Sequence, residues 1–290
     1  MEDFFCSIFQ WIMFFLILFL YRRNEIITIS PLFNNLHELF ILEFPTARNF
    51  KNPNLSIIIP AYNESKRIVS TLRKLFYYID YLNVDSCTEI IIVNDGSYDD
   101  TVSKVYSSLL YIPKDSKILL SVVSLRRNLG KGMALLAGSY VAKGRMLLFM
   151  DADCSTDLSE IQKFIERISP NVILCGSRYS VNYPERVGIL RNVLTVLFKK
   201  FYRFILSLND IEDSQCGFKL IFKSDYFKFI HEQKLFNWTF DIEFILLAKK
   251  NNIKILNIPV QWHDEKGSKL RVFEDAPNML LDILVLKSCL

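Results

Sequence analysis

The sequence predicts an α/β protein built on a doubly wound, mostly parallel β-sheet. Two observations support this fold class. Short apolar runs alternate with amphipathic helical stretches through the first half of the chain, and each run is followed by polar or turn-forming residues. The length of 290 residues is enough for one large domain with a full hydrophobic core. Because ligands of open α/β sheets bind beyond the carboxyl ends of the strands, the residues that follow these runs form the candidate site.

The elements of the first half are expected to alternate between strand and helix. The strands are predicted at 55–59, 89–93, 117–124 and 146–150, and the helices at 65–82, 99–110 and 130–143. A short strand is expected at 172–175 and a long helix at 186–207, and residues 276–290 form a strongly apolar end. The last two segments suit either core helices or helices that lie on a membrane surface.

Residues 4–21 form an 18-residue stretch without a charge, just long enough for a transmembrane helix, although a buried core helix is the alternative. Arg22 and Arg23 follow it, and the positive-inside rule keeps them in the cytosol. We therefore expect an N-terminal anchor over residues 1–23, a connector over 24–53, a cytosolic domain over 54–275, and a C-terminal apolar helix over 276–290 that is possibly membrane-associated.

Composition narrows the class of protein further. With 35 basic and 31 acidic residues, the net charge of +4 is too balanced for a nucleic-acid binder, and no obligate protein partner is indicated. The six cysteines are scattered without a metal-ligand spacing, which is typical of reduced cytosolic thiols. The hydrophobic content of 51% and the mean hydropathy of +0.20 are high for a soluble enzyme and agree with a membrane anchor.

Asp151 and Asp153 follow the predicted strand 146–150 and are separated by one residue. Period-two alternation places both carboxylates on the same side of the chain. Two acidic groups in one site repel each other unless a cation lies between them, and a divalent metal that carries substrate phosphates is a common solution. Taken alone, the pattern also suits an ordinary solvated turn.

The other strand ends carry groups that complement these two acids. Residues 60–64 begin with Pro60, which we expect to end its strand, and include Tyr62 and Glu64, whose carboxylate can accept hydrogen bonds from ribose hydroxyls. Asp95 can accept a hydrogen bond from a nucleotide base, and Lys131 opens a helix whose bare amides suit anionic groups. Together these residues predict a pocket for a nucleoside diphosphate with a metal.

The motifs resemble those of the inverting GT-A glycosyltransferases of family 2, and within them the polyprenyl-phosphate sugar transferases. The residues that carry this resemblance are 57–64 (IIIPAYNE), 93–97 (VNDGS), 128–132 (NLGKG) and 151–153 (DAD). Four later motifs are similar to those of the dolichyl-phosphate β-glucosyltransferases: 175–178 (CGSR), 213–219 (DSQCGFK), 240–243 (FDIE) and 267–269 (GSK). The resemblance implies a GT-A, Rossmann-like fold over roughly residues 54–275.

The resemblance also implies the roles of the donor-side residues. Asp95 is expected to contact the uracil of UDP-glucose, Glu64 and Asp151 its ribose side, and Asp153 the Mg²⁺ or Mn²⁺ on the diphosphate. Asp151 is the second carboxylate expected at the metal. Lys269, in a Gly-Ser-Lys loop, is expected to neutralise the departing UDP.

On the acceptor side, the resemblance implies dolichyl phosphate in the endoplasmic reticulum membrane, with dolichyl β-D-glucosyl phosphate made for protein N-glycosylation. Arg178 and Arg191 are expected to hold the acceptor phosphate, and Asp213 to orient it. Two alternatives stay open: a dolichyl-phosphate mannosyltransferase that uses GDP-mannose, and a non-catalytic scaffold of the same fold. Residues 213–219 favour glucose over mannose.

Overall fold

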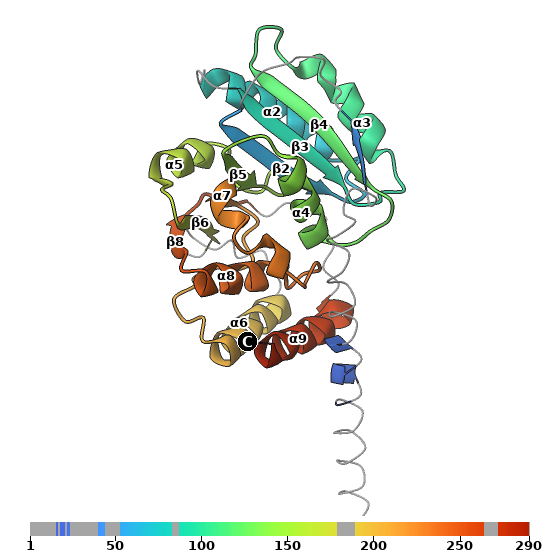
Figure 1. Cartoon of the computed structure of the whole chain (residues 1–290). Coiled ribbons are helices and arrows are strands. Elements are labelled where there is room, and N and C mark those ends of the chain that lie inside the picture. Colours follow the sequence, from blue (N-terminus) through green and yellow to red (C-terminus); the bar gives the residue numbers. More distant parts are fainter. Residues whose placement is uncertain are drawn as a thin grey trace, which may run out of the picture. The chain divides into compact units, whose positions relative to one another are not determined.

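The computed structural model describes residues 53–82, 87–178, 189–263 and 272–289, together with residues 16, 18–20, 22, 23 and 40–43 (Figure 1). The side chains of residues 189–194 and 272–274 are not part of this description. The chain divides into two compact units. The sheet unit is Asn35–Arg186 with Ile211–Ser268, and the helical unit is Met1–Asn34 with Val187–Asp210 and Lys269–Leu290.

The sheet unit holds an eight-stranded sheet with the order β1-β4-β3-β2-β5-β7-β6-β8. In chain order the strands are β1 (Phe40–Glu43), β2 (Leu55–Ala61), β3 (Thr88–Asn94), β4 (Ile118–Leu125), β5 (Met146–Phe149), β6 (Val172–Ser177), β7 (Lys219–Phe222) and β8 (Lys254–Pro259). The central strands β4, β3, β2 and β5 are parallel, as are β6 and β8. β1 and β7 run antiparallel to the strands they pair with. The predicted α/β fold with a mostly parallel sheet is confirmed.

The register of the central strands brings their carboxyl ends to one edge. Ala61 at the end of β2 lies beside Asn94 at the end of β3, and Asp95 N–H donates to the carbonyl of Ala61 at 2.8 Å. Pro60 does not end its strand, contrary to expectation, because β2 continues through it to Ala61. The reason is that β5 pairs with β2 only as far as Ile58 and then departs, so the missing N–H of proline leaves no ladder bond unmade.

Helices cover both faces of this sheet (Figure 1). Those of the sheet unit are α2 (Ile68–Leu82), α3 (Thr101–Ser107), η2 (Ser108–Tyr111), α4 (Lys131–Val141), α5 (Glu160–Arg167), α7 (Lys223–Tyr226), η4 (Ile230–Glu232) and α8 (Phe240–Lys250). The apolar stripe of α2, which includes Leu72 and Phe76, packs in the same core as Ile57 and Ile59. α4 covers the opposite face, where the backbone of Gly138 lies against Ile58 and Val93. Alternate residues of β2 therefore face the two helix layers.

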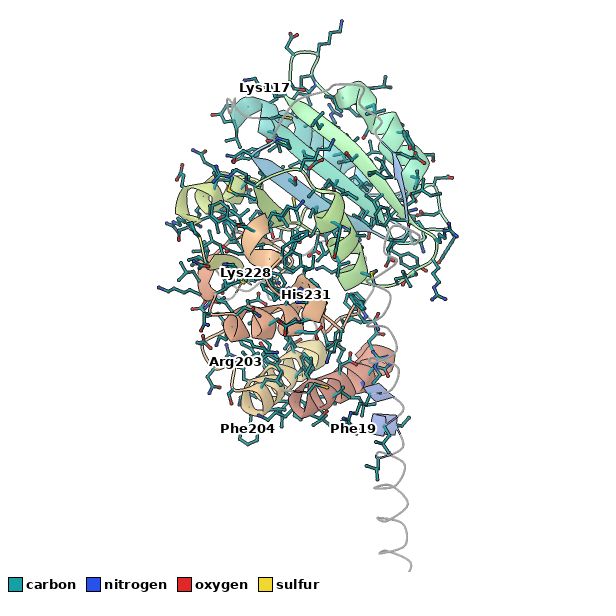
Figure 2. All side chains as sticks on the ribbon, in the orientation of Figure 1. Phe19, Lys117, Arg203, Phe204, Lys228 and His231 are labelled. Carbon is teal, nitrogen blue, oxygen red and sulfur yellow. The ribbon has the colours of Figure 1, made fainter. Side chains whose placement is uncertain are left out.

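The helical unit contains α6 (Ile189–Leu206) and α9 (Val272–Ser288). Arg22 Nε lies 2.7 Å from Asp282 Oδ1, so Arg22, which follows the predicted anchor, contacts α9. Phe204 is 83% exposed at the end of α6 (Figure 2). Among the described residues, no helix is both long and apolar enough to cross a membrane. Most of the predicted anchor lies outside those residues; 16, 18–20, 22 and 23 are helical.

Two features of the domain organisation differ from the expected one. β1 lies within residues 24–53, which we expected to be a connector, and it extends the sheet by pairing with β4. α6 lies within the expected domain of residues 54–275 but belongs to the helical unit, so the sheet unit is interrupted in sequence. Both differences arise from long-range pairing, which a local hydrophobic pattern does not encode.

Candidate active site

Glu64 and Arg67 form the first part of the site, just beyond β2. Glu64 is 7% exposed, and both of its carboxylate oxygens accept hydrogen bonds from Arg67, from Nε and from Nη2, each at 2.8 Å. The Nη1 atom of Arg67 lies 3.8 Å from Asp153 Oδ2. Arg67 therefore joins two acids that the sequence placed at separate strand ends. It was not predicted, although its position three residues after Glu64, where the chain enters α2, was a usable signal.

The remaining predicted residue at this strand end is Tyr62. Its ring meets that of Tyr98 edge to face, with centroids 6.0 Å apart, so two aromatic side chains lie together beyond β2 and β3. Asn63 N–H donates to the hydroxyl of Ser97 at 2.9 Å, which ties the same two loops together. The structure thus brings Tyr62 to the predicted edge, and its contact with a nucleotide stays a prediction.

Asp95 supports the loop that leads into α4. Its carboxylate accepts hydrogen bonds from the N–H groups of Leu129 at 2.7 Å and Gly130 at 2.9 Å. Burial raises the pKa of Asp95, while these two backbone donors oppose the rise. Each carboxylate oxygen has a second lone pair, so the predicted contact with uracil is compatible with this arrangement and stays a prediction.

Asp151 lies between a lysine and a glycine. Lys131 Nζ is 2.6 Å from Asp151 Oδ1, and a Cβ atom at Gly217 would collide with the carboxylate. Burial alone would raise the pKa of Asp151, but the ammonium of Lys131 holds it below its usual value. Lys131, which was predicted to hold anionic groups, therefore neutralises one of the two acids, and the segment that contains Gly217 touches the other side of the same acid.

Asp153 differs from Asp151 in the direction of its pKa shift, and its carboxylate is a candidate ligand for a cation. Burial, with the negative charge of Asp151 as a second cause, raises its pKa. Its Oδ1 accepts the N–H of Ser155 at 3.0 Å, and a quarter of the side chain is exposed. Among the described residues no three acidic, histidine or cysteine groups cluster as a complete metal site. The protein therefore offers one or two carboxylates as metal ligands. Mg²⁺ bound in this way takes its other oxygen ligands from the substrate phosphates and from water.

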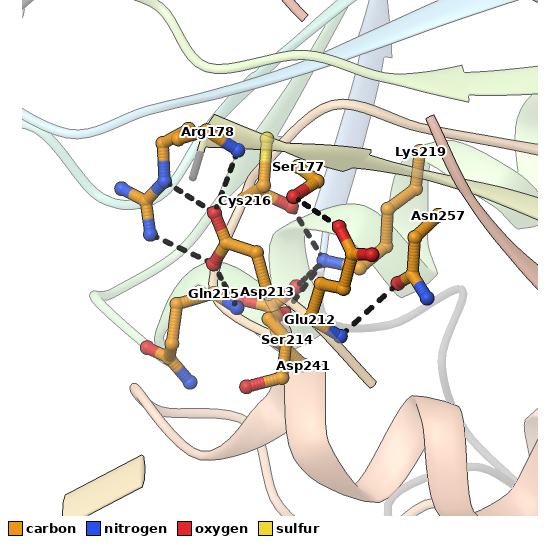
Figure 3. Close-up of polar contacts among 10 residues, drawn as sticks. All are labelled: Ser177, Arg178, Glu212, Asp213, Ser214, Gln215, Cys216, Lys219, Asp241 and Asn257. Atoms are coloured by element: carbon orange, nitrogen blue, oxygen red, sulfur yellow. Dashed lines mark hydrogen bonds and ion pairs between the residues drawn. The ribbon is translucent and has the colours of Figure 1, made fainter. Parts of the chain in front are cut away.

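Arg178 and Asp213 form the second half of the site (Figure 3). Arg178 follows β6, and its Nε and Nη2 donate to the two carboxylate oxygens of Asp213 at 2.6 and 2.9 Å. The Asp213 side chain is 2% exposed and that of Arg178 is 20% exposed. Burial would raise the pKa of Asp213, but the guanidinium holds it below its usual value. Asp213 is therefore an ionised carboxylate that fixes Arg178 by a bidentate contact.

Trp262 lies against the same arginine and was not predicted. The guanidinium carbon of Arg178 is 5.5 Å from the centre of the Trp262 ring, within the range of a cation–π contact. Trp262 pairs with Thr156 in an antiparallel bridge, and His263 N–H donates to the carbonyl of Ser155 at 2.8 Å. The chain that follows Asp153 is therefore held by the segment that covers Arg178.

The buried Arg178–Asp213 pair has a consequence for acid stability. Because the folded-state pKa of Asp213 is lowered, the pair stabilises the fold above the unfolded pKa of about 3.9, and this contribution is lost as pH falls through the folded pKa. We expect wild type to exceed Asp213→Asn in free energy of unfolding by a constant amount above about pH 5, and by less as pH falls below about 4. Urea unfolding of both proteins between about pH 7 and about pH 3 measures the difference. A difference that does not change with pH would contradict the assignment.

Two predicted residues are not placed by these contacts. Lys269 lies outside the described residues. Arg191 is in α6, within the part of that helix whose side chains are not described. Their predicted contacts with UDP and with the acceptor phosphate stay predictions.

Comparison with known proteins agrees with this geometry. A family model described as glycosyl transferase family 2 matches residues 56–230, which include β2 to β7 and the carboxylates at both halves of the site. The chain belongs to glycosyl transferase family 2. The predicted family membership is thereby confirmed.

Individual members of family 2 are similar over most of their length. A dolichyl-phosphate β-glucosyltransferase of Dictyostelium discoideum is 35% identical over 83% of this chain and 77% of its own. One from Saccharomyces cerevisiae is 31% identical over 80% of this chain and 74% of its own. The predicted resemblance to these enzymes is confirmed.

The fold is shared with a solved structure. The crystal structure of glucosyl-3-phosphoglycerate synthase from Mycobacterium tuberculosis, in complex with Mn²⁺ and UDP-glucose, matches 81% of this chain and 79% of its own with a TM-score of 0.52 and 18% identity. At this identity the match supports the fold alone, and it agrees with the sheet described above.

As a family 2 transferase, the chain holds the donor and acceptor groups whose contacts are described above on the sheet unit, whereas Arg191 and Lys269 belong to the helical unit. The segment that begins at Asp213 reaches Gly217, which contacts Asp151. The five consecutive residues 213–217 thus connect Asp151, one of the two acids after β5, with Arg178, which Asp213 holds. This arrangement suits a transfer between two phosphorylated substrates.

Proposed function

We propose that this protein transfers glucose from UDP-glucose to dolichyl phosphate with inversion, giving dolichyl β-D-glucosyl phosphate for protein N-glycosylation. Two relatives that match 80% or more of this chain are named dolichyl-phosphate β-glucosyltransferases, which supports glucosyl transfer to dolichyl phosphate. The observation that carries the proposal is the buried Arg178–Asp213 pair. Gly217, four residues after Asp213, lies against the carboxylate of Asp151 and so links the pair to that acid. An arginine fixed by a carboxylate is suited to a phosphate acceptor.

The donor half is proposed to bind the diphosphate through the two acids after β5. Asp153 would hold Mg²⁺ or Mn²⁺, because the cation nearest to it, Arg67, is 3.8 Å away, whereas Asp151 is paired with Lys131 at 2.6 Å. The bound cation would supply charge neutralisation for the diphosphate leaving group. Lys131, which lies at the start of α4, would face the anionic donor through its ammonium. The bare amides expected at this helix start are not available, because Gly132 N–H donates to the carbonyl of Phe236 at 2.7 Å and Gly130 N–H donates to Asp95 at 2.9 Å.

The acceptor half needs no strong base. A phosphate monoester is already largely ionised at neutral pH, so its oxygen can attack the anomeric carbon of glucose without losing a proton to the protein. Asp213 is ionised and engaged with Arg178, so its proposed role is to orient that guanidinium against the acceptor phosphate. Trp262 limits the motion of the same guanidinium from its ring face.

The acceptor lipid calls for contact with a membrane, and the exposed residues of the helical unit support it. Val196, Leu197 and Phe204 of α6 are 49%, 56% and 83% exposed, and Leu280 and Leu284 of α9 are 38% and 39% exposed. We propose that the protein is a single-pass protein of the endoplasmic reticulum membrane with its sheet unit in the cytosol. Apolar groups on surface helices gain free energy by entering a lipid interface.

The function is tested by offering the purified protein dolichyl phosphate, a divalent ion, and labelled UDP-glucose or GDP-mannose in parallel reactions. Formation of glucolipid from UDP-glucose alone is the expected result. Mannolipid from GDP-mannose would instead assign the mannosyl reaction. Absence of product with both donors, from folded protein, would favour the non-catalytic scaffold.

The topology is tested separately in sealed microsomes. We expect added protease to digest the sheet unit without detergent. Protection of the sheet unit until the vesicles are opened would place it in the lumen and contradict the proposed orientation.

A further inference from the structure

Lys219, at the start of β7, is the most deeply buried charged side chain near the site that the proposed reaction does not use. Its side chain is 1% exposed, and it follows Phe218 in a run that is otherwise apolar. A buried ammonium is costly unless all of its donors are satisfied, so the partners of Lys219 show what it is for.

Three hydrogen bonds leave the ammonium of Lys219, one for each of its N–H groups (Figure 3). Nζ lies 3.0 Å from the carbonyl oxygen of Ser214, 2.6 Å from that of Cys216, and 2.5 Å from Asp241 Oδ1. Asp241 is in the first turn of α8 and is 5% exposed. Burial would lower the pKa of Lys219, but the adjacent carboxylate of Asp241 keeps it above its usual value, so the ammonium stays charged.

The two carbonyl contacts fall on the segment 213–217, which connects the two halves of the site. At one end, Asp213 holds Arg178 through two hydrogen bonds. At the other end, Gly217 leaves no space between its backbone and the carboxylate of Asp151. A displacement of this segment would therefore move the acceptor arginine relative to the donor acid Asp151, which Lys131 holds separately at 2.6 Å.

We propose that Lys219 is a positioning residue that fixes the segment 213–217 against α8 and thereby sets the distance between the donor acid Asp151 and the acceptor pair Arg178–Asp213. Lys219 acts through Asp213 and Gly217 and need not touch a substrate. This inference rests on the proposed function for its catalytic consequence, but the structural role of Lys219 is independent of which sugar is transferred.

Three variants separate this role from a general effect on folding. Lys219→Met removes all three hydrogen bonds and leaves Asp241 buried without its cation. Lys219→Met with Asp241→Asn removes the same bonds but keeps the charge balanced, so it guards against a failure to fold. Asp241→Asn alone keeps both carbonyl contacts of Lys219. Lys223→Met is the matched control, since Lys223 Nζ also donates to a backbone carbonyl, that of Ala142, away from the site.

Hydrogen–deuterium exchange of residues 213–218 is the direct readout. We expect exchange there to be at least about ten-fold faster in both proteins that contain Lys219→Met. The change should be smaller in Asp241→Asn, which loses the counter-charge of Lys219 but keeps its two carbonyl contacts, and smallest in Lys223→Met. Wild-type exchange in the doubly substituted protein would overturn the proposal, because the carbonyl contacts would then not hold the segment.

Steady-state kinetics provide the second readout. Because Lys219 acts on the distance between the two half-sites, we expect both Lys219→Met proteins to lose about ten-fold or more in kcat/KM for dolichyl phosphate while their Kd for UDP stays within about two-fold of wild type. Unchanged kinetics in a protein with faster exchange would contradict the link to catalysis. If wild type itself forms no glucolipid, the proposed function fails, whereas the exchange measurement still decides the role of Lys219.

Discussion

Asp153→Asn is expected to lower glucose transfer by about a hundred-fold or more. A metal at a diphosphate contributes several kcal/mol of charge stabilisation, and each 1.4 kcal/mol is about ten-fold in rate. Asparagine keeps the size of the side chain and its acceptor oxygen for the N–H of Ser155, which lies 3.0 Å from Asp153 Oδ1. The variant should therefore fold normally and differ from wild type in charge alone.

The matched control for this variant is Asp80→Asn, since Asp80 is an exposed acid of α2. Activity of both proteins is measured with UDP-glucose over a range of Mn²⁺ concentrations, and Mn²⁺ binding is followed directly by electron paramagnetic resonance. We expect Asp153→Asn to lose both activity and Mn²⁺ binding, with Asp80→Asn like wild type. Near-normal turnover or Mn²⁺ binding in Asp153→Asn would remove Asp153 from the metal site.

Arg178→Met is expected to destabilise the protein as well as to inactivate it. The side chain of Asp213 is 2% exposed, so removal of its partner leaves a buried charge unpaired, which typically costs about 3–5 kcal/mol in free energy of unfolding. Urea unfolding measures that loss. Transfer to dolichyl phosphate should fall by about a hundred-fold or more, because the guanidinium that is proposed to hold the acceptor phosphate is removed.

Arg178→Lys separates the catalytic part of this effect from the structural part. Lysine keeps the positive charge near Asp213 but cannot make the two parallel hydrogen bonds. We expect KM for dolichyl phosphate to rise by about ten-fold, with Kd for UDP unchanged. Arg73→Lys is a close control, because Arg73 also lies over an aromatic ring, that of Tyr111 at 5.3 Å. Equal effects of the two substitutions, or a change confined to UDP binding, would argue against an acceptor role for Arg178.

The first half of the fold could be predicted because its signals are local. Runs such as 55–59 and 89–93 are buried strands with turn residues behind them, and the apolar spacing of α2 is visible in the sequence. β1 has only four residues and sits alone before the first clear strand, so its pairing with β4 has no local signature. β7 is as short as β1 and runs antiparallel to both of its neighbours, β5 and β6. The chain reaches β7 from β6 through α6, which belongs to the helical unit, so no local pattern predicts this pairing.

The acids of the site could be predicted, and so could two of the cationic residues that pair with them, Lys131 and Arg178, but Arg67 and Lys219 could not. Asp151, Asp153 and Asp95 follow strands, so topology alone brings them to one edge. Lys219 and Asp241 are separated by 22 positions in the sequence and meet only because β7 and α8 are brought together. The one available signal was a lysine within a buried run, which requires a partner.

The same balance explains why the two acids of the Asp-Ala-Asp motif differ. Asp151 is paired with Lys131 and has a lowered pKa, whereas Asp153 has a raised pKa and only a distant contact with Arg67. Sequence spacing treats the two positions as equivalent. Their division of roles comes from the long side chains that reach them from α4 and from the start of α2.

The most direct test of the central claim is the structure of the product formed by wild-type protein from UDP-glucose and dolichyl phosphate. The isolated glycolipid is examined by proton nuclear magnetic resonance for the coupling of its anomeric proton. A single displacement at one site that holds both substrates gives the β-glucosyl linkage, the inverse of the α-linkage in the donor. An α-linked product, or free glucose without glycolipid, would contradict the proposed inverting transfer.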